Sequence, residues 1–512
     1  MYPLSHILQR AIALYPHRLA LVDGHVRLTY RELGERVHRL AAGLLGLGLK
    51  RGDRVAILDW NSHRYLEMYY ACAHAGLAFM PVNSRLALPE LRYVLKDSDA
   101  RALAFSEPFL PMYEELKHTL AHGIGLALPK APVDYEALLA GAVPMRKPVA
   151  TELDEIMQIY YTSGTTGEPK GVCLTNRNMY AGGLDGVLAL SATREDSWQH
   201  SGPLFHLASS FAAWSMPIVG GAQLTVHFDP QRAIQSIATE KVTMTSLPGA
   251  ILGLMADVPG ISARVSSLRT IIYGGAPTPM GVLKKAGAVL PGLSHAYGIT
   301  ETAGYVTNLK PIDHVFDGSG DELRRTASAG QATPLIDVRV VDDNGRDLGP
   351  GEVGEVVCGG AKIMAGYWRK PEATAAVLKD GWYHTGDMGS MDEQGYLTLV
   401  DRKKDMIISG GENVYSIEVE SVLSLHPAVA EVAVIGIPDE KWGEAVTAIV
   451  VPRPGTSPTA EDIVVFCRGR IAGYKAPKSV VFRSEALPKT GPGKIAKRIL
   501  RDPYWKGTGR KI

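Results

Sequence analysis

A loop rich in hydroxyl and glycine side chains is the segment of this sequence best suited to chemistry. It reads YYTSGTTGEPKG over residues 160–171 and follows an apolar run of strand type. Its glycines allow the backbone to present N–H groups to an anion, its hydroxyls add donors, and its lysine adds a positive charge. The pattern predicts a phosphate-binding loop made of Thr162, Ser163, Gly164, Thr165, Thr166, Gly167 and Lys170.

The competing interpretation of this loop is a flexible linker rich in Ser, Thr and Gly. Apolar segments bound the loop on both sides, the second being VCLTN, so the loop interrupts folded structure and does not join domains. It also differs from the phosphate loop G-x-x-x-x-G-K-[ST], because Lys170 lies three residues beyond Gly167 and is followed by Gly171. A phosphate-binding motif of another kind is indicated.

Further segments with chemical side chains accompany the loop along the chain. They are YGGAP at 273–277, HAYGITETAG at 295–304, YHTGD at 383–387, DRKKDMIISGGENVYSIEVE at 401–420 and PKTGPGKIAKRILR at 488–501. With the loop they resemble, in order, the motifs of the adenylate-forming superfamily, which comprises acyl-CoA synthetases, firefly-type luciferases and the adenylation domains of peptide synthetases. The sequence is most like an acid–CoA ligase. The resemblance implies ATP, Mg²⁺ and coenzyme A as cofactors and a small-molecule carboxylic acid as substrate.

Activation of a carboxylate explains why a metal ligand is needed at the nucleotide. An anion must meet the α-phosphate of ATP, so the site has to cancel charge on both partners and on the leaving pyrophosphate. Glu301 has the carboxylate that Mg²⁺ prefers beside phosphate oxygens, although a lone Glu is also a common helix cap. The resemblance makes Glu301 a catalytic metal ligand and Thr162 a second ligand on the other side of the triphosphate.

The base and the sugar of the nucleotide have their own expected contacts. Tyr297 offers a flat face for adenine, while core packing is the other role open to it. For Asp387, an Asx turn is the alternative to the ribose contact that the resemblance implies. The residues expected around the nucleotide, besides the loop, are Gly275, Ala276, Pro277, Ala296, Tyr297, Gly298, Thr300, Asp387 and Arg402.

A lysine near the carboxyl terminus, Lys494, lies in the glycine-bounded segment GPGKIAK. From composition alone, this segment could equally well be a solvated basic tail with no catalytic role. The resemblance makes Lys494 the catalytic lysine that reaches the substrate carboxylate and the adenylate oxygens. A compact ammonium on a flexible stem suits that bridging role.

The second half of the reaction needs a thiol in place of the catalytic lysine, so a small domain is expected to rotate. The resemblance implies a hinge at Lys404, in a charged stretch of the kind that absorbs backbone rotation. The residues then expected to line a tunnel for the pantetheine of CoA are Ser409, Gly410 and Gly411. A tight turn before a helix that starts near Ser416 is compatible with the same glycines.

The segment PLFHLASSFAAW, residues 203–214, resembles the family segment that forms one wall of the acyl pocket. His206 is expected near the substrate carboxylate in a gating or orienting role, whereas most lone histidines of this kind are core residues. Amino-acid-activating relatives usually carry an aspartate in this segment, and its absence argues against a free amino acid. The residues expected to line the acyl pocket are His206, Trp214, Ser246, Gly249 and Gly304. Their mixture of aromatic, small and apolar character favours a medium-length, branched, cyclic or aryl acid over acetate.

These motifs need a large layered fold to position them. The 512 residues exceed the ~250–300 residues of a single hydrophobic core, so at least two domains are expected. Early segments alternate helical patterns with short aliphatic strands, and Thr29 and Glu32 have the spacing of a capping box.

The fold class that follows is α/β, with a change of pattern along the chain. From about Asp337 short β-rich runs predict a β subdomain, and strands mix with amphipathic segments after Asp401. We expect residues 1–400 to form a large ATP- and acyl-binding domain of layered α/β subdomains plus the β-rich subdomain. Residues 401–512 are expected to form a small mobile α+β domain that carries the catalytic lysine.

Composition limits the partners of the protein. Lys and Arg number 54 against 53 Asp and Glu, so the net charge of +1 creates no field toward nucleic acid or anionic lipid. No apolar run is long enough for an integral membrane segment, and the amino terminus lacks a signal-peptide stretch, so a cytoplasmic enzyme is expected. The four cysteines lack the paired spacing of zinc sites. A monomer and a homodimer are both open.

Three functions are compatible with the sequence. The leading one is an ATP-dependent acid–CoA ligase, which forms an acyl-adenylate with release of pyrophosphate and then, by domain alternation, transfers the acyl group to CoA with release of AMP. The second passes the acyl group to an amine, as an amide bond synthetase, or to a carrier protein. The third is a silent relative that only binds nucleotide or acyl ligand, against which the intact loop, Glu301 and Lys494 argue.

Overall fold

The computed structural model describes residues 1–162, 168–227, 229–275, 278, 280–410, 412–439, 441–489 and 495–506. Contacts divide the chain into two compact units. The first comprises Met1–Val338 and Cys358–Tyr383, and the second comprises Arg339–Val357 and His384–Ile512. The domain boundary expected at Asp401–Lys404 stays a prediction.

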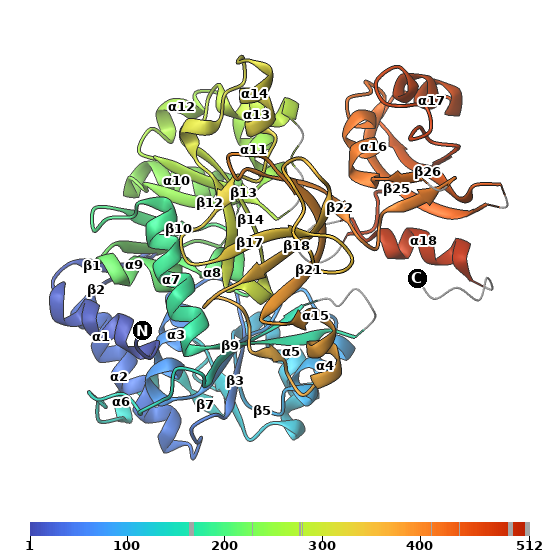
Figure 1. Cartoon of the computed structure of the whole chain (residues 1–512). Helices are drawn as coiled ribbons and strands as arrows, with labels where there is room; N and C mark the ends of the chain where they lie inside the picture. The colour runs from blue at the N-terminus through green and yellow to red at the C-terminus, as the bar shows by residue number, and fades with distance from the viewer. Residues whose placement is uncertain are drawn as a thin grey trace. The chain divides into compact units, whose positions relative to one another are not determined.

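One sheet of the first unit carries the strands on both sides of the expected phosphate loop. Its strand order is β19-β9-β8-β4-β3-β5-β6-β7. Figure 1 labels β9, β3, β5 and β7 of this sheet in the lower part of the ribbon. The strands from β8 to β7 run parallel to their neighbours, whereas β9 is antiparallel to both β8 and β19. The bounds are β3 Arg54–Leu58, β4 Ala78–Pro81, β5 Ala100–Phe105, β6 His122–Gly125, β7 Val133–Asp134, β8 Ile156–Thr162, β9 Lys170–Thr175 and β19 Gly366–Tyr367.

The other sheet of the first unit carries the segments expected to hold the base and the acid. Its order is β16-β15-β14-β13-β12-β10-β11-β1-β2. The strands from β14 to β1 are parallel to one another, and antiparallel strands close both edges. The bounds are β1 Leu19–Asp23, β2 Val26–Thr29, β10 Ser197–His200, β11 Ala222–Thr225, β12 Met244–Pro248, β13 Thr270–Gly274, β14 Leu293–Ile299, β15 Gly304–Leu309 and β16 Gln331–Ala332.

Amphipathic helices cover these sheets. The capping box expected at Thr29 and Glu32 is confirmed, because the Thr29 hydroxyl accepts from Glu32 N and the Glu32 carboxylate accepts from Thr29 N. The bounds are α1 Ser5–Leu14, α2 Tyr30–Gly46, α3 His63–Ala75, α4 Leu88–Asp97, α5 Leu110–Leu116, α6 Tyr135–Gly141, α7 Asn176–Leu190, α8 Leu207–Ser210, α9 Ala212–Val219, α10 Pro230–Glu240, α11 Gly249–Ala256, α12 Ile261–Arg264, α13 Met280–Gly287, α14 Gly320–Thr326 and α15 Pro371–Val377.

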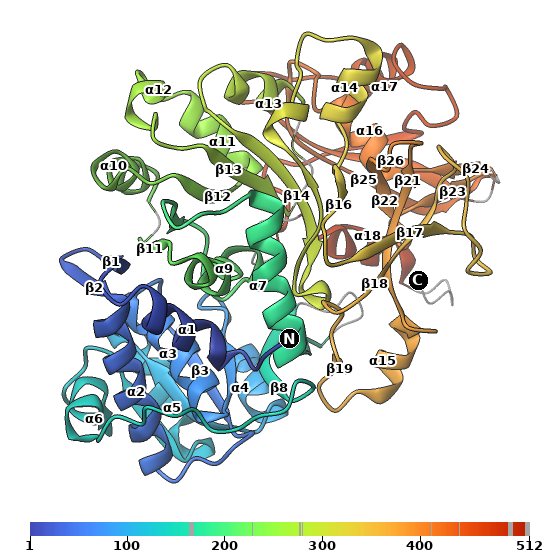
Figure 2. The same ribbon diagram turned by 60° about the vertical axis from the view of Figure 1, so that its left-hand side comes forward.

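Glycines let α7 approach α9 closely (Figure 2). A Cβ atom on Gly183 would lie 3.0 Å from Cβ of Trp214, and one on Gly186 would lie 2.5 Å from Oγ of Ser215. The Ser215 hydroxyl donates to the Gly183 carbonyl at 2.9 Å. Trp214 is therefore held by backbone packing as well as by its ring contacts.

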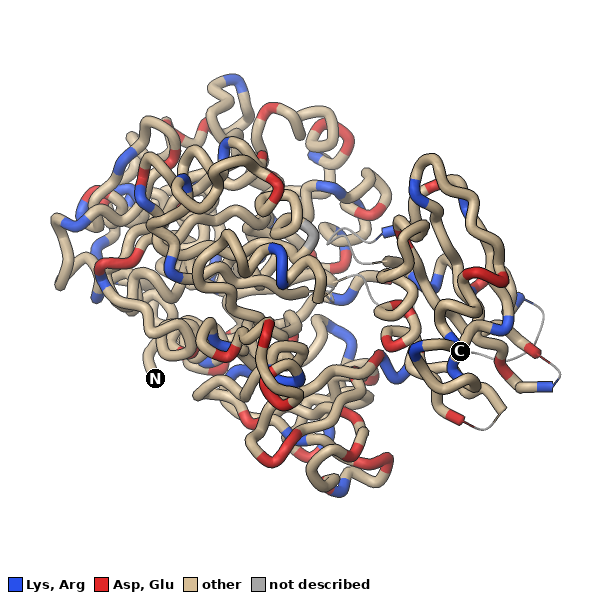
Figure 3. Tube along the Cα trace, turned by 90° about the horizontal axis from the view of Figure 1, so that it is seen from above, with Lys and Arg blue, Asp and Glu red and all other residues tan. Residues whose placement is uncertain are grey.

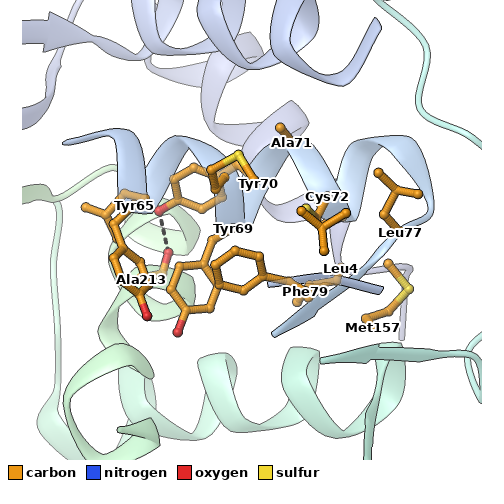
Figure 4. Close-up of a cluster of buried hydrophobic side chains, with 14 of the residues drawn as sticks. Leu4, Tyr65, Tyr69, Tyr70, Ala71, Cys72, Leu77, Phe79, Met157 and Ala213 are labelled. Carbon is orange, nitrogen blue, oxygen red and sulfur yellow. Dashed lines mark hydrogen bonds between the residues drawn. The ribbon is translucent and has the colours of Figure 1, made fainter. Parts of the chain in front are cut away.

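Three tyrosines of α3 form the centre of the main core of the first unit (Figure 4). Tyr65 and Tyr69 pack around Phe79, whose ring centroid lies 4.3 Å from that of Tyr69. Tyr70 turns the other way, and its hydroxyl donates to the Ala213 carbonyl at 2.6 Å. This core consequently joins the sheet that contains β4 to the start of α9.

The second unit combines a β-rich part with a small α+β part. Most residues of β17 Asp337–Val341, β18 Gly354–Gly359, β21 Trp382–Met391 and β22 Leu397–Arg402 belong to this unit. β20 Leu378–Lys379 lies in the first unit, where it pairs with Trp382 and Tyr383 at the start of β21. Next come β23 Ile407–Ser409, β24 Glu412–Val414, α16 Ser416–Leu423, β25 Val429–Asp439, β26 Gly443–Pro452, α17 Ala460–Arg468, β27 Ser479–Phe482 and α18 Lys497–Trp505. Layered α/β sheets followed by this β-rich part confirm the α/β fold class.

Charged residues of both signs are interspersed along the chain trace (Figure 3). This distribution agrees with the net charge of +1.

An exception to surface placement is Lys362, whose side chain is 1% exposed and pairs with Asp185, 2% exposed. Its ammonium also donates to the Tyr305 carbonyl and, at 3.3 Å, to the Thr333 hydroxyl. Burial lowers the pKa of Lys362, and the Asp185 carboxylate opposes that shift.

We predict that Lys362→Met lowers the free energy of unfolding by about 3–5 kcal/mol, because it leaves Asp185 buried without its counter-ion. The matched control is Lys284→Met, whose pair with Asp317 is 60% and 83% exposed. Exposed pairs contribute about 1 kcal/mol or less. Urea unfolding followed by circular dichroism checks both variants, and equal midpoints would contradict the prediction.

Candidate active site

The two strands that flank the expected phosphate loop fix its ends. β8 and β9 pair with Tyr161 opposite Gly171 and Thr162 opposite Lys170. The structure therefore places the Thr162 and Lys170 side chains at the same end of the strand pair. Ser163, Gly164, Thr165, Thr166 and Gly167 lie outside the described residues, so their expected contacts stay predictions.

Glu301 lies beside this strand pair in a short 3₁₀ turn, Thr300–Thr302, between β14 and β15. The Tyr367 hydroxyl donates to Oε1 of Glu301 at 2.9 Å. The Lys170 ammonium lies 5.1 Å from the centre of the Tyr367 ring. Glu301 and Lys170 thus both contact Tyr367. The motif analysis did not single out this tyrosine. Tyr367 lies 66 residues from Glu301, so no local spacing could have revealed the contact.

The phenols next to Glu301 are held in the protonated form. Burial raises the pKa of Tyr367 well above its ordinary value, and the Glu301 charge adds to that effect. The same two causes raise the pKa of Tyr383, which hydrogen-bonds to Tyr367. Because Tyr367 donates to Glu301, it accepts from Tyr383, so a chain of O–H donors ends on the carboxylate.

The donor set around Glu301 fits a hard cation such as Mg²⁺. Among the residues that the structure describes, no three His, Cys, Asp or Glu side chains gather in a way that could hold a metal ion. Mg²⁺ is usually bound by one or two carboxylates together with substrate phosphates, and not by an all-protein cage. A single carboxylate at Glu301 and a hydroxyl at Thr162 match that mode of binding.

The residues expected around adenine lie where β13 and β14 end. These strands pair with Gly274 opposite Ala296, which puts Tyr297 and Gly298 one step further along. Tyr297 is 8% exposed, so most of its ring packs against protein and only an edge or part of a face is left for a base. Gly275 is exposed, Thr300 is half-buried, and Ala276 and Pro277 lie outside the described residues.

In the second unit, the strand pair β21 and β22 joins the two side chains expected at the ribose. Asp387 and Arg402 are opposite each other in this pair, and Nε of Arg402 lies 2.9 Å from Oδ1 of Asp387. Asp387 N also donates to the Thr385 hydroxyl at 3.0 Å, as in a local turn. The local turn and a role at the nucleotide are compatible for Asp387.

Gly410 lies in the turn that follows β23 and leads to β24. Gly410 has a φ of +65°, and a Cβ atom there would lie 2.9 Å from the Trp442 ring. Its N–H donates to the Trp442 carbonyl at 2.7 Å, while Ser409 is buried. A side chain at Gly410 is thus excluded by conformation and by space. Gly411 lies outside the described residues, and the expected helix start at Ser416 is confirmed.

Lys494 itself lies outside the described residues, so its role stays a prediction. The residues on either side of its segment are placed, and Lys489 forms an antiparallel bridge with Ile495. Lys489 also pairs with Glu431. Lys489 and Ile495, on either side of the segment that contains Lys494, are therefore neighbours in the small α+β part.

Tyrosines position the segment that was expected to form the acyl wall. The Tyr69 hydroxyl donates to the Leu204 carbonyl at 2.8 Å, and the Tyr70 hydroxyl donates to the Ala213 carbonyl at 2.6 Å. Tyr160 of β8 meets the Ser210 hydroxyl at 2.9 Å. The wall is thereby tied at its beginning, middle and end to α3 and to the strand that precedes the phosphate loop.

The expected wall residues differ in how they are held. His206 is half-buried at the N-terminus of α8, with its ring centroid 4.5 Å from that of Phe205. Trp214 is buried, and its ring meets Tyr70 edge-on at 5.3 Å. Ser246 in β12, Gly249 at the start of α11 and Gly304 in β15 are buried, and β12 and β15 belong to the same sheet with β13 and β14 between them. Their contact with an acid stays a prediction.

Comparison with known proteins identifies the class. The model of the AMP-binding enzyme family matches residues 8–368, and that of the AMP-binding enzyme C-terminal domain matches residues 418–494. Feruloyl-CoA synthase of Amycolatopsis sp is 40% identical over 495 residues, which cover 96% of this chain and 97% of that one. Indoleacetate–CoA ligase of Aromatoleum aromaticum is 38% identical and covers 97% of each chain.

Solved structures agree with this comparison. ATP-bound MatB from Rhodopseudomonas palustris has a TM-score of 0.87 at 29% identity and covers 99% of this chain and 100% of its own. The amide bond synthetase McbA from Marinactinospora thermotolerans has a TM-score of 0.86 at 30% identity, covering 98% of this chain and 100% of its own.

The class that fold and motifs define is that of the adenylate-forming enzymes. The chain belongs to the AMP-binding enzyme family, as the motifs predicted, and is an AMP-forming acid–thiol ligase, or acyl-CoA synthetase. None of the helices in the described part of the chain has the length and hydropathy needed to span a bilayer.

We predict that Tyr69→Phe lowers kcat/KM for the acid about 3- to 10-fold, because a typical hydrogen bond contributes about 0.5–1.5 kcal/mol. The KM for ATP should stay unchanged. Tyr65→Phe is the matched control on the same helix, since the buried Tyr65 hydroxyl has no hydrogen-bond partner among the described residues. Steady-state kinetics with each substrate varied in turn checks both variants. An equal change of kcat/KM for the acid in the two variants would refute a role of the hydrogen bond from Tyr69 to the Leu204 carbonyl.

Proposed function

We propose that this enzyme joins a bulky, largely apolar carboxylic acid to coenzyme A, with aryl acids as the first candidates. The observation that supports this most is the 40% identity to a feruloyl-CoA synthase over nearly the whole chain. A ligase for indoleacetate is similar over the same length. The aromatic and small residues expected around the acid, with no aspartate in residues 203–214, agree with such a substrate.

The first step would join the carboxylate to the nucleotide. A carboxylate oxygen attacks the α-phosphorus of ATP, and the bond from that phosphorus to the pyrophosphate oxygen breaks. Lys170 and the hydroxyls of the loop would bind the departing phosphates. Glu301 and Thr162 would hold Mg²⁺, which supplies positive charge against the triphosphate when bound. Lys494 would neutralise the substrate carboxylate as the two anions meet.

The second step would exchange AMP for a thiol. The CoA sulfur attacks the acyl carbon, and the bond to the adenylate oxygen breaks, which releases AMP. We infer that the small domain, residues 401–512, turns about Lys404 between the steps. That movement would withdraw Lys494 and bring Ser409, Gly410 and Gly411 to the pantetheine. Asp387 and Arg402 would keep the ribose in place.

Transfer to an amine or to a carrier protein is the second candidate function. It is supported by the TM-score of 0.86 to an amide bond synthetase at 30% identity. A ligase that loads fatty acid onto an acyl carrier protein is 36% identical. The acceptor therefore needs a direct test.

We expect the enzyme to form CoA thioesters when given ATP, Mg²⁺, CoA and a panel of ferulate, indoleacetate, benzoate, dodecanoate and acetate. The aryl acids should have the highest kcat/KM and acetate the lowest, because the expected walls combine aromatic and apolar side chains with small residues that leave room for a ring. Mass spectrometry of the thioester, with AMP measured in parallel, checks this. Amide formation from added amines with CoA omitted, at a rate above thioester formation, would favour the second candidate instead.

We expect Lys494→Ala to slow adenylate formation by ~10²- to 10³-fold, the effect typical of removing one group that stabilises developing charge. Pyrophosphate release with acid and ATP but no CoA measures this step. Lys489→Ala is the matched control in the same basic segment, since that lysine pairs with Glu431. An unchanged rate in Lys494→Ala would remove this lysine from the mechanism.

A further inference from the structure

The strand that carries Tyr367 is built onto the edge of the phosphate-loop strands. β19 pairs with β9, with Gly366 opposite Cys173 and Tyr367 opposite Val172. β9 begins at Lys170, so the tyrosine lies along the same strand edge as the lysine of the loop. The segment around Tyr367 is thereby fixed relative to the loop by main-chain hydrogen bonds.

The same segment is also bound to the backbone of Glu301. Met364 N donates to the Glu301 carbonyl at 2.9 Å, and Trp368 N donates to the Gly171 carbonyl at 2.7 Å. Tyr367 N donates to the Thr374 hydroxyl at 2.9 Å. Residues 364–368 therefore bridge the turn that carries Glu301 and the strand that starts at the loop.

The Tyr367 side chain contacts a charged group on each side of this bridge. Its hydroxyl donates to Oε1 of Glu301 at 2.9 Å, while its ring faces the Lys170 ammonium at 5.1 Å. A hydrogen bond to one oxygen fixes the rotamer of a carboxylate, and a ring face attracts a cation through its quadrupole. The hydroxyl and the ring thus act on two different site residues.

We propose that Tyr367 is a positioning residue for the metal–nucleotide site, through its hydroxyl on Glu301 and its ring beneath Lys170. This inference rests on the proposed function, in which Glu301 holds Mg²⁺ and Lys170 binds phosphate. Partners that orient a metal ligand set the affinity for the ion, and their loss weakens it about 10- to 100-fold. Tyr383 supports the arrangement, because it donates to the Tyr367 hydroxyl.

Two substitutions separate the two actions of Tyr367. Tyr367→Phe keeps the ring and removes the hydroxyl, so it should weaken metal binding about 10- to 100-fold and leave metal-free ATP binding within about twofold. Tyr367→Leu removes both, and it should in addition weaken metal-free ATP binding about 2- to 5-fold through the loss of the cation–ring attraction.

The measurement is a titration of Mn²⁺ into the full-length enzyme with ATP, followed by electron paramagnetic resonance, without acid or CoA so that no turnover occurs. Isothermal titration with ATP in the presence of a chelator gives the metal-free affinity. The matched control is Tyr135→Phe, which removes another hydroxyl that donates to a carboxylate, Oε2 of Glu67 at 2.6 Å. Glu67 keeps its partner Arg36, and Mn²⁺ binding should not change.

The variant Glu301→Gln separates failure of this inference from failure of the proposed site. If Glu301→Gln weakens Mn²⁺ binding and Tyr367→Phe leaves it within about twofold of wild type, the role of Tyr367 is refuted. If neither variant weakens Mn²⁺ binding, the assignment of Glu301 as metal ligand fails as well. Equal losses of ATP affinity with and without metal in Tyr367→Phe would also overturn the inference. Should Tyr367→Leu fail to fold, Tyr367→Phe alone decides whether Tyr367 affects metal binding.

Discussion

The antiparallel pairing of β9 with β8 on one side and β19 on the other is the constraint on which the candidate site depends. A triphosphate and a carboxylate repel each other, so groups that offset their charge must be held in place before they meet. Here Lys170 starts the middle strand, Thr162 ends one neighbour and Tyr367 lies on the other. Backbone hydrogen bonds, and not flexible side chains, set the spacing of these three groups.

The acid side of the site depends on a different kind of contact. Tyrosines from α3 donate hydrogen bonds to carbonyls near both ends of residues 203–214. Glycines of α7 allow that helix to pack closely against Trp214 and Ser215 of α9. These contacts are neutral and buried, so salt has little influence on them. The side of the site proposed to bind the nucleotide thus relies on charge, and the side proposed to bind the acid relies on packing.

Local patterns in the sequence sufficed for the fold class and for several elements. The capping box at Thr29 and the helix start at Ser416 depend on neighbouring residues, which is why they could be predicted. The motifs also led to the family. The partners of motif residues could not be predicted in the same way, because Tyr367 and Glu301, or Tyr69 and Leu204, meet only after the chain has folded. A buried lysine such as Lys362 runs against the usual surface placement of that residue, so composition gave no sign of it.

The pair formed by Lys362 and Asp185 has a consequence for how this enzyme can evolve. Lys362 binds the carbonyl of Tyr305, directly after the expected wall residue Gly304, so the pair supports the region where acid selectivity would change. A single substitution at either position leaves one charge buried without its counter-ion, whereas replacing both residues with apolar side chains of similar volume is often neutral or stabilising. Single substitutions at Lys362 or Asp185 will therefore be removed by selection for stability, whereas paired substitutions at the two positions can be retained.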